Sequence, residues 1–415
     1  MTKKIWLVNK YAMPPQYESR LRTIKFAHYL QEMGYKVTVF GSSVMHNMDL
    51  DLIEDDSKYI ERQYDDLHFV HIKSCQYKKT AGLSRIWSDV QFHYRLVRLA
   101  KRFEKPDVVV ATTFPLFFNP LLKYCHKHGI KYITEVLDWW PDDFVDFGLI
   151  GEKNPVMKYL FKVAKRNYAD SDASVFSLGG CFKYFEDKGW DKAHGGPVDL
   201  SHVFYINNGV DLNDFNNWKN QFTIEDADLV SDKKRIIYLG SIRYANNVEQ
   251  LVKAAEILKE RKDVEFLIYG DGDDREPLIN YCKAQNLDNV KFKDKWIDPK
   301  YVPFVLSQSY ISILNYTASF GKYGISSSKM FQYMASGKPI VCNVEIMYSP
   351  IEKYQIGISR NMTSAQDYAD ALLSILNLSD DEYSAMCERA KEAAKEFDYS
   401  YLAKQMDKVI MNLWK

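Results

Sequence analysis

Short apolar runs alternate along the chain with longer segments in which apolar residues recur every three or four positions. A continuous apolar run is typical of a strand buried on both faces, and the longer period is typical of an amphipathic helix. In the first half the predicted strands are residues 5–9, 36–40, 67–72, 107–111, 131–135 and 173–177. The predicted helices between them are 20–33, 84–103, 119–128 and 155–169. Buried strands that alternate with helices predict a parallel, doubly wound sheet.

The same alternation starts again near residue 204. The predicted strands of this second series are 204–207, 235–239, 264–269, 290–293, 310–314 and 339–342. The predicted helices are 248–262, 277–286 and 328–336, and the end of the chain is helical. We therefore expect two α/β domains, one formed by residues 1–203 plus 399–415 and the other by residues 204–398. Ligands of such sheets bind at the carboxyl ends of the strands, so we expect a site in the cleft between the domains.

Composition excludes several classes of protein. The 415 residues carry 55 Lys and Arg against 55 Asp and Glu, and this balance argues against a strongly basic nucleic-acid binder. The six cysteines lack zinc or redox spacing, so we interpret them as reduced thiols of the core. No apolar stretch has the length of a signal peptide or a membrane span. We expect a cytoplasmic protein with no nucleic-acid partner.

Several common sequence motifs are missing from the chain. There is no GxGxxG after the first strand, no GxxxxGK[ST], no HExxH and no GxSxG. Asp-x-Asp pairs that could bind a metal occur at 49–51, 170–172 and 271–273, but such pairs arise easily in acidic loops. We expect neither a metal ion nor a cofactor.

The segment 324–341 holds the strongest candidate chemistry. The serines 326–328 open a predicted helix whose first backbone N–H groups have no partner within the helix. These N–H groups and the helix dipole form a site for an anion, and Lys329 adds a positive charge. A capped helix with a solvated lysine is the alternative interpretation.

Two further segments directly follow predicted strands. The first ends in Arg243, whose guanidinium could bind a phosphate with two parallel hydrogen bonds. The second, Gly270-Asp-Gly272, permits close approach of the backbone to a ligand. Each segment taken alone is also compatible with an ordinary surface turn.

Together these segments resemble the retaining nucleotide-sugar glycosyltransferases of family 4, which have the two-domain GT-B fold. The matching pieces are 206–215 (INNGVDLNDF), 238–254, 266–282, 289–296 and 326–341. In the first half, 135–143 (EVLDWWPDD) resembles a loop of the bacterial polysaccharide members. The resemblance implies two Rossmann-like domains that face each other across a cleft. It also implies metal-independent transfer of a hexosyl or N-acetylhexosaminyl group, with retention, from a nucleotide diphosphate donor, most simply a UDP-sugar.

The resemblance assigns donor-binding roles to individual residues. Arg243 and Lys329 would hold the donor diphosphate and stabilise the charge of the leaving group, helped by N–H groups of Ser327 and Ser328. Gln332 would bind the ribose. The other residues expected to bind the donor are Gly240, Ser241, Gly270, Asp271, Gly272, Trp296 and Ile297.

The first domain would supply the acceptor side. By the same resemblance Glu135 and Asp138 would be catalytic and would face the transferred sugar or the acceptor. The chain departs from the family pattern at several positions. Gly324 and Gln332 stand in place of a pair of Glu, and Leu137 stands where His or Arg is common. The Lys that usually follows the loop Arg is replaced around Asn246-Asn247.

Residues 84–105 mix aromatic and basic side chains. These are Arg85, Trp87, Phe92, Tyr94, Arg95, Arg98, Lys101, Arg102, Phe103 and Lys105. Such a helix suits the inner membrane surface or a lipid-linked acceptor, and it also suits an ordinary core helix with a solvated face.

The pathway that the resemblance implies is capsule, exopolysaccharide or O-antigen synthesis, with a lipid-linked or oligosaccharide acceptor and peripheral contact with the membrane. Two alternatives remain open. One is a nucleotide-sugar 2-epimerase of the same architecture, and the other is a non-catalytic GT-B subunit that binds only a donor or a partner.

Overall fold

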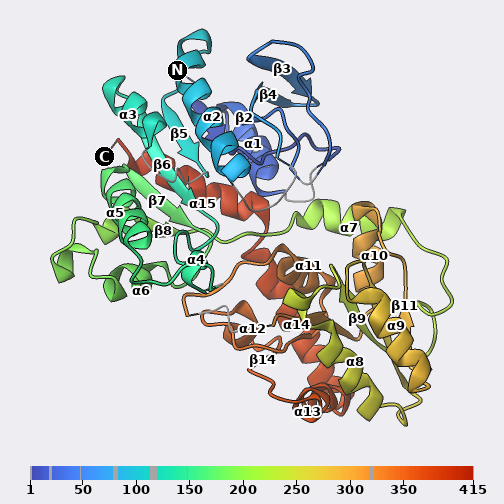
Figure 1. The fold of residues 1–415 in the computed structure, drawn as a ribbon. Helices are drawn as coiled ribbons and strands as arrows, with labels where there is room; N and C mark the ends of the chain where they lie inside the picture. Colours follow the sequence, from blue (N-terminus) through green and yellow to red (C-terminus); the bar gives the residue numbers. More distant parts are fainter. Residues whose placement is uncertain are drawn as a thin grey trace. The chain divides into compact units, whose positions relative to one another are not determined.

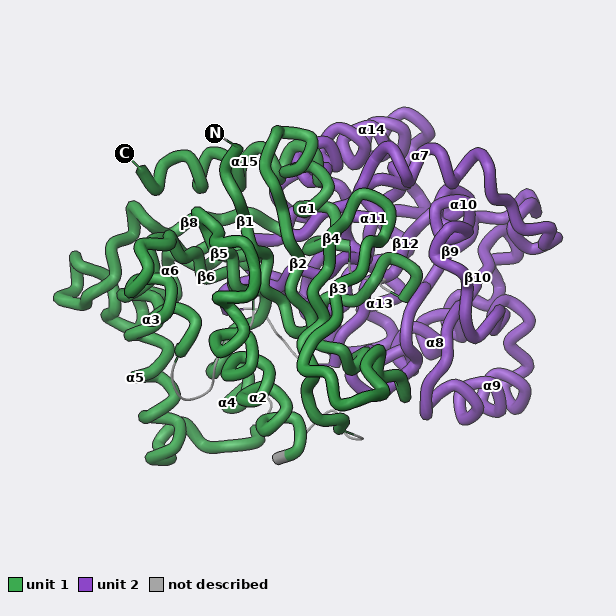
Figure 2. The backbone as a smooth tube through the Cα atoms, turned by 90° about the horizontal axis from the view of Figure 1, so that it is seen from above, with its two compact units in different colours: residues 1–207, 399–415 green, residues 208–398 purple. Residues whose placement is uncertain are grey.

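The computed structural model describes residues 2–17, 21–46, 48–77, 83–112, 119–146, 148–317 and 322–414. The chain divides into two compact units, coloured green and purple in Figure 2. Unit 1 contains Met1–Asn207 and Tyr399–Lys415, and unit 2 contains Asn208–Asp398.

Unit 1 is built on an eight-stranded sheet with the order β3-β4-β2-β1-β5-β6-β7-β8 (Figure 1). The strands are β1 (Lys4–Val8), β2 (Lys36–Ser42), β3 (Tyr59–Tyr64), β4 (Leu67–Ile72), β5 (Val108–Ala111), β6 (Lys131–Val136), β7 (Ala173–Phe176) and β8 (Val203–Tyr205). All neighbouring pairs are parallel except β3 and β4. The predicted parallel sheet is thus confirmed, with one antiparallel strand added at its edge.

The helices of unit 1 cover both faces of this sheet. They are α1 (Arg22–Glu32), α2 (Leu83–Leu99), α3 (Pro120–Lys127), α4 (Asp143–Asp146), α5 (Pro155–Asp170), α6 (Cys181–Asp187) and α15 (Tyr399–Asn412). Ile5 and Leu7 of β1 belong to one core with α1 and α15, whereas Trp6 and Val8 belong to another with α2 and α3. Successive side chains of a strand point to opposite faces of the sheet. Helix α15, red in Figure 1, therefore packs on the same face of the unit 1 sheet as α1.

One predicted strand belongs to a different sheet from the one expected. The sequence predicts residues 204–207 as the start of the second domain, but Ser174, Val175 and Phe176 of β7 pair with β8. The boundary between the units therefore lies after Asn207 and not at the predicted residue 204. An apolar run predicts a buried strand without indicating which sheet it joins.

Unit 2 contains a six-stranded parallel sheet with the order β11-β10-β9-β12-β13-β14. Its strands are β9 (Lys234–Leu239), β10 (Val264–Tyr269), β11 (Val290–Phe292), β12 (Ile311–Leu314), β13 (Ile340–Cys342) and β14 (Gly357–Ser359). Its helices are α7 (Leu212–Gln221), α8 (Val248–Ile257), α9 (Arg275–Ala284), α10 (Val302–Ser307), α11 (Ser328–Ser336), α12 (Pro350–Lys353), α13 (Ala365–Leu376) and α14 (Asp380–Lys395).

Each sheet has a point at which the strand order reverses. In unit 1 the chain moves from β1 to one side and returns to β5 on the other, and in unit 2 β9 and β12 are the corresponding neighbours. The carboxyl ends of strands at such a reversal form the ligand site of open α/β sheets. The strand order therefore predicts that the loops that follow β1, β5, β9 and β12 contribute to ligand sites.

Candidate functional site

In unit 2 the loops after β9, β10 and β11 are joined by backbone hydrogen bonds. Ile242 N donates to Asp271 O over 2.8 Å, and Gly270 N donates to Asp294 O over 3.0 Å. The segments that the sequence singled out around Arg243 and Gly270 thus lie side by side at the carboxyl edge of the sheet.

Lys329 lies directly against the first of these loops. A Cβ atom added to Gly240 would overlap Lys329 Nζ, so only glycine allows this approach. The ammonium group also lies 5.3 Å from the centroid of the Tyr238 ring. Burial lowers the pKa of Lys329 to about 8. In the described part of the chain no carboxylate lies within ion-pair distance of this half-buried lysine.

Arg243 extends over the second loop. A Cβ atom on Gly272 would lie 2.2 Å from Ile242 O and 2.9 Å from Arg243 Cγ, so glycine allows the loop after β9 to lie close to this turn. The arginine is exposed, and it has no acidic partner among the residues that the structure describes. Lys329 and Arg243 thus each lie against a glycine of these loops, and no described carboxylate lies within ion-pair distance of either cation.

The first turn of α11 offers hydrogen-bond donors beside Lys329. Ser327 is the N-cap residue, but its side chain does not cap the helix, and the first turn contains no acidic residue. Within the described ranges the backbone N–H groups of Ser328 and Lys329 have no acceptor. The capped helix considered from the sequence is therefore not what the structure has. The backbone N–H groups in the uncapped first turn of α11 are available to bind an anion.

Hydrogen bonds hold the loop after β9 in place. Tyr238 Oη donates to Ser241 O over 2.6 Å. Asn246 Nδ2 donates to the same oxygen over 2.9 Å and to Ser241 Oγ over 2.7 Å. Ser241 itself is exposed, so this residue is fixed by its backbone while its surface stays open to a ligand.

Arg275 supports the site and was missed by the sequence analysis. This buried residue donates from Nη1 to Gly270 O and from Nη2 to Lys293 O, each over 2.6 Å. It is the first residue of α9, where a cation is unfavourable to the helix dipole. That unfavourable position was the signal that could have identified it.

The other residues that the sequence predicts to bind the donor lie on the loops after β10 and β11 and on α11. Lys295 Nζ lies 3.6 Å from Asp271 Oδ1, which links the β11 loop to the glycine turn. The adjoining Trp296 is 73% exposed, whereas Ile297 is half-buried and packs on the core. Gln332 lies on α11, one turn after Lys329, and is also half-buried.

In unit 1 the two acidic candidates differ sharply in exposure. Glu135 in β6 is 5% exposed, and its Oε1 accepts from Arg22 Nε over 2.8 Å. Its other oxygen accepts a hydrogen bond from the Thr112 hydroxyl. Asp138 lies in the loop after β6 and is exposed. The structure thus ties Glu135 to side chains of its own unit and leaves Asp138 open to solvent.

The loop of Asp138 is rich in carboxylates. Burial, together with the negative charges of Asp138, Asp146 and Asp142, raises the pKa of Asp143 to about 7. Asp142 is neutralised by Lys188, whose Nζ lies 2.6 Å from Asp142 Oδ1. Across the described residues no group of three or more His, Cys, Asp or Glu side chains is arranged to hold a metal ion.

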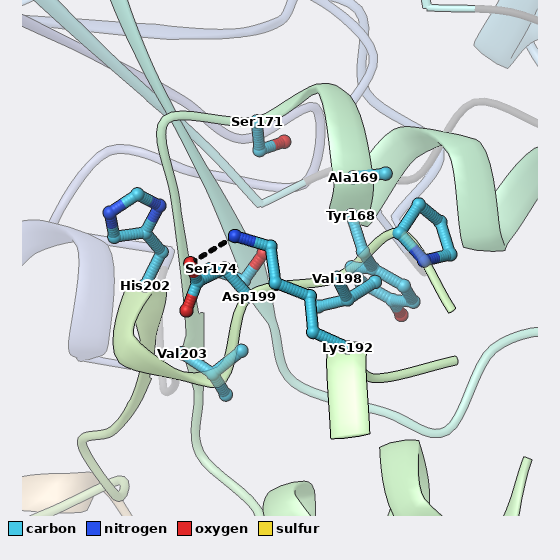
Figure 3. A pocket seen from close by; sticks show the side chains of 10 residues that line it. Tyr168, Ala169, Ser171, Ser174, Lys192, Val198, Asp199, His202 and Val203 are labelled. Atoms are coloured by element: carbon cyan, nitrogen blue, oxygen red, sulfur yellow. Dashed lines mark hydrogen bonds and ion pairs between the residues drawn. The ribbon is translucent and has the colours of Figure 1, made fainter. Parts of the chain in front are cut away.

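A small pocket of about 190 Å³ occurs elsewhere in unit 1, near the amino ends of β7 and β8. Figure 3 shows Lys192 directed toward Asp199 beside His202, and Lys192 Nζ lies 2.5 Å from Asp199 Oδ2. The pocket contains none of the candidate site residues and lies at the opposite edge of the sheet from the strand ends discussed above.

Part of the chain is similar to a known protein family. Residues 220–397 match the family described as "Glycosyl transferases group 1". A search of curated proteins found no significant match to the chain.

Solved structures resemble the chain over its whole length. One is described as trehalose-6-phosphate from E. coli bound with UDP-2-fluoro glucose, with a TM-score of 0.73, 10% identity and 99% of each chain covered. A trehalose 6-phosphate synthase from Burkholderia multivorans has a TM-score of 0.73 and 12% identity, covering 100% of this chain and 99% of its own. A glycosyltransferase from Rickettsia africae ESF-5 has a TM-score of 0.64 and 15% identity, with the same coverage.

The two parallel-sheet units therefore form a GT-B fold, as the resemblance implied. The residues that match the glycosyl transferase family, 220–397, all lie within unit 2. At these low identities the solved structures establish the fold and not the substrates.

Proposed function

We propose that the protein transfers a hexosyl or N-acetylhexosaminyl group, with retention and without a metal ion, from a UDP-sugar. One observation carries this proposal. Lys329 packs on Gly240 as a half-buried cation at the carboxyl edge of a sheet that belongs to a glycosyltransferase domain. Burying a positive charge is unfavourable, and a bound diphosphate would offset that cost.

The chemistry follows from where the cations lie. When the bond between the sugar and the diphosphate breaks, negative charge grows on the leaving phosphate oxygen. Lys329 and Arg243 would bind that charge more strongly in the transition state than in the bound donor, which lowers the barrier. The backbone N–H groups of Ser328 and Lys329 would add the positive ends of fixed dipoles, which also stabilise negative charge. Cations and dipoles held in this way do work that a metal ion does in other enzymes.

The rest of the donor would lie along the adjoining loops. The exposed indole of Trp296 can stack on a nucleobase, and the half-buried amide of Gln332 can bond a ribose hydroxyl. The glycine turn at Gly270–Gly272 leaves room for the backbone to approach the nucleotide.

We assign the acceptor to unit 1, where Asp138 would face the transferred sugar or the acceptor. The acceptor would be lipid-linked or an oligosaccharide, in capsule, exopolysaccharide or O-antigen synthesis at the cytoplasmic face of a membrane. The basic and aromatic surface of α2 supports this assignment. No helix in the described ranges has the length and apolar character to span a membrane, so contact with lipid would be peripheral.

Two measurements on the purified chain test the donor assignment. UDP at about 100 times its dissociation constant should raise the free energy of unfolding by about 2.7 kcal/mol. Slow hydrolysis of UDP-sugars should be detectable, and Lys329→Met and Arg243→Ala should each reduce it by about 100-fold. Lys262→Met removes an exposed lysine of the same unit and serves as the control.

The outcomes separate the candidate functions. UDP-sugar binding without any turnover would point to a non-catalytic subunit, and release of an isomerised sugar would point to an epimerase. No response to any nucleotide, or normal hydrolysis by both variants, would contradict the proposed diphosphate site.

A further inference from the structure

The pocket near the amino ends of β7 and β8 has room for a small ligand. Its lining residues come from the end of α5, from the two strands and from the segment 192–202 between them (Figure 3). The volume of the pocket is about 190 Å³, and a cavity of about 150 Å³ is large enough for one six-membered ring. The pocket therefore accommodates a ligand of about one ring.

A buried hydroxyl group lines this pocket without a hydrogen-bond partner. Ser174 of β7 is 2% exposed, and its hydroxyl forms no hydrogen bond with any residue in the described ranges. By contrast, the hydroxyl of Ser171, which also lines the pocket, is hydrogen-bonded to Thr134 Oγ1 and to Asn167 O, each over 2.7 Å. Buried hydroxyl groups normally have a partner, because an unmade hydrogen bond is unfavourable. A ligand hydroxyl in the pocket would supply the partner of Ser174.

The charges of the pocket balance each other. Lys192 Nζ lies 2.5 Å from Asp199 Oδ2. Hydrogen bonds from Lys192 and Ser201 hold the pKa of Asp199 below its ordinary value, so this carboxylate is charged at neutral pH. A charged ligand would have to compete with this ion pair. An uncharged ligand with hydroxyl groups can accept from Lys192 and donate to Asp199 while the pair stays intact.

The rest of the lining offers further hydrogen-bonding groups beside apolar ones. Ala169 belongs to the last turn of α5, where carbonyl groups have no partner within the helix. The ring of His202 is exposed beside Lys192 and Asp199 (Figure 3). Val198 and Val203 are buried and supply apolar surface. This combination matches a sugar ring, which has hydroxyl groups at its edge and C–H groups on its faces.

We propose that this pocket binds one uncharged sugar ring, which Ser174, Lys192 and Asp199 hold by hydrogen bonds. The inference goes beyond the proposed function and does not depend on it. The pocket contains no residue of the proposed donor site, and all of its lining residues belong to unit 1. No bond of the sugar forms or breaks there, so the site binds a saccharide without transforming it.

Binding of methyl glycosides to the full chain tests the proposal. The probes are methyl α-D-glucopyranoside, methyl α-D-galactopyranoside and methyl α-D-mannopyranoside, titrated by calorimetry, and we expect at least one of them to bind. Ser174→Ala should weaken that binding by about threefold to tenfold, because it removes one hydrogen bond. Ala169→Phe should abolish the binding, because the added ring would occupy the pocket. Two exposed positions of the same unit serve as controls, since Ser84→Ala and Lys162→Phe change no residue that lines the pocket.

The variants are chosen so that a folding defect does not obscure the result. Thermal unfolding shows whether Ala169→Phe folds, since Ala169 is half-buried. If it does not fold, Ser174→Ala decides the question, because this change removes a single oxygen atom. Unchanged affinity in Ser174→Ala, an equal loss in the two control variants, or no binding of any of the three glycosides would each overturn the proposal.

Inorganic phosphate distinguishes a sugar site from a site for an anion. If phosphate binds more tightly than every glycoside, and Lys192→Met removes that binding, the pocket is an anion site and the proposal is wrong. The donor function is judged separately by UDP binding and UDP-sugar hydrolysis. If both of these fail while Ser174→Ala still weakens glycoside binding, the transferase proposal is wrong and the sugar site stands.

Discussion

Arg22 and Glu135 form a buried ion pair in which Arg22 Nε lies 2.8 Å from Glu135 Oε1, and the two side chains are each 5% exposed. Arg22 also donates to Ile206 O over 2.9 Å and to Asn207 O over 2.5 Å. The first segment of unit 1 ends at Asn207, so the pair connects α1 and β6 to the place where the chain passes into unit 2. We infer that Glu135 acts by positioning Arg22.

Breaking this pair should strongly destabilise the protein. Glu135→Ala leaves the charge of Arg22 buried without its carboxylate, and the expected loss is about 3–5 kcal/mol in the free energy of unfolding. Urea unfolding measures it. The exposed pair of Arg166 and Asp170 provides the control, because Arg166→Gln should cost less than about 1 kcal/mol. If Glu135 instead contacted the substrate, Glu135→Gln would abolish turnover while the urea midpoint stayed unchanged.

The pKa of Lys329 predicts a pH dependence of donor use. Its pKa is lowered from 10.5 to about 8, so the free enzyme loses this positive charge as the pH rises through about 8. The kcat/KM for the UDP-sugar reports the free enzyme and should fall about tenfold per pH unit above that value. Lys329→Arg, which stays charged, should be slower but should lack this alkaline fall. A wild-type profile that is flat to pH 10 would contradict the assignment.

The same shift predicts how stability changes with pH. Between about 8 and 10.5 the unfolded chain binds a proton at Lys329 that the folded chain does not, so the free energy of unfolding rises with pH across this window. Below it the buried charge lowers stability. Lys329→Met should therefore increase the free energy of unfolding at pH 7 and flatten the rise, which urea titrations at pH 7 and pH 10 would show. Equal stability of the variant and the parent chain at pH 7 would argue against burial of the ammonium.

Gly240→Ala should distinguish a loss of donor affinity from a general loss of stability. The added Cβ would collide with Lys329 Nζ, so we expect UDP affinity to fall by at least about tenfold as the ammonium is displaced. Gly34→Ala is a matched control, because Gly34 also has a positive φ but a Cβ there would meet nothing within 4 Å. Both variants should lose roughly 1 kcal/mol or more of stability from the backbone conformation. Equal UDP affinity in the two variants would exclude a role for the contact.

Much of the fold could be predicted because its signals are local. Three elements, β4, β10 and α11, have the predicted limits, since each is a clear apolar or amphipathic segment bounded by turn or polar residues. β3 was missed because its residues are half-buried or exposed and form no apolar run. α7 was missed because its segment is polar and buries only Phe215.

The site was predictable in its parts but not in its contacts. Glycines and cations that follow strands are visible in the sequence, but the approach of Lys329 to Gly240 depends on how α11 packs on the sheet. The burial of Glu135 depends on Arg22, which is 113 positions away. Such long-range partners leave no periodic pattern, so the burial of a carboxylate expected to face the transferred sugar or the acceptor could not be predicted.

The exposed face of α2 should bind anionic membranes. Trp87 and Tyr94 are 59% and 50% exposed, and the Arg98 guanidinium lies 4.6 Å from the centroid of the Tyr94 ring. Positions 87, 94 and 98 share one helix face, and exposed Arg102 continues the positive charge beyond it. Each basic residue near an anionic surface contributes about 1 kcal/mol, so Arg98→Gln with Arg102→Gln should weaken vesicle binding by roughly 30-fold.

Sedimentation with vesicles containing phosphatidylglycerol measures this binding, and vesicles of phosphatidylcholine alone should bind little of the parent chain. Trp87→Ala with Tyr94→Ala should weaken binding in a salt-independent way, because these rings contribute buried apolar area and not charge. Tyr401→Ala is the control, since Tyr401 is 45% exposed on α15. Equal binding to both kinds of vesicle, or an equal loss in the Tyr401 variant, would show that the face of α2 is only a solvated surface of a core helix.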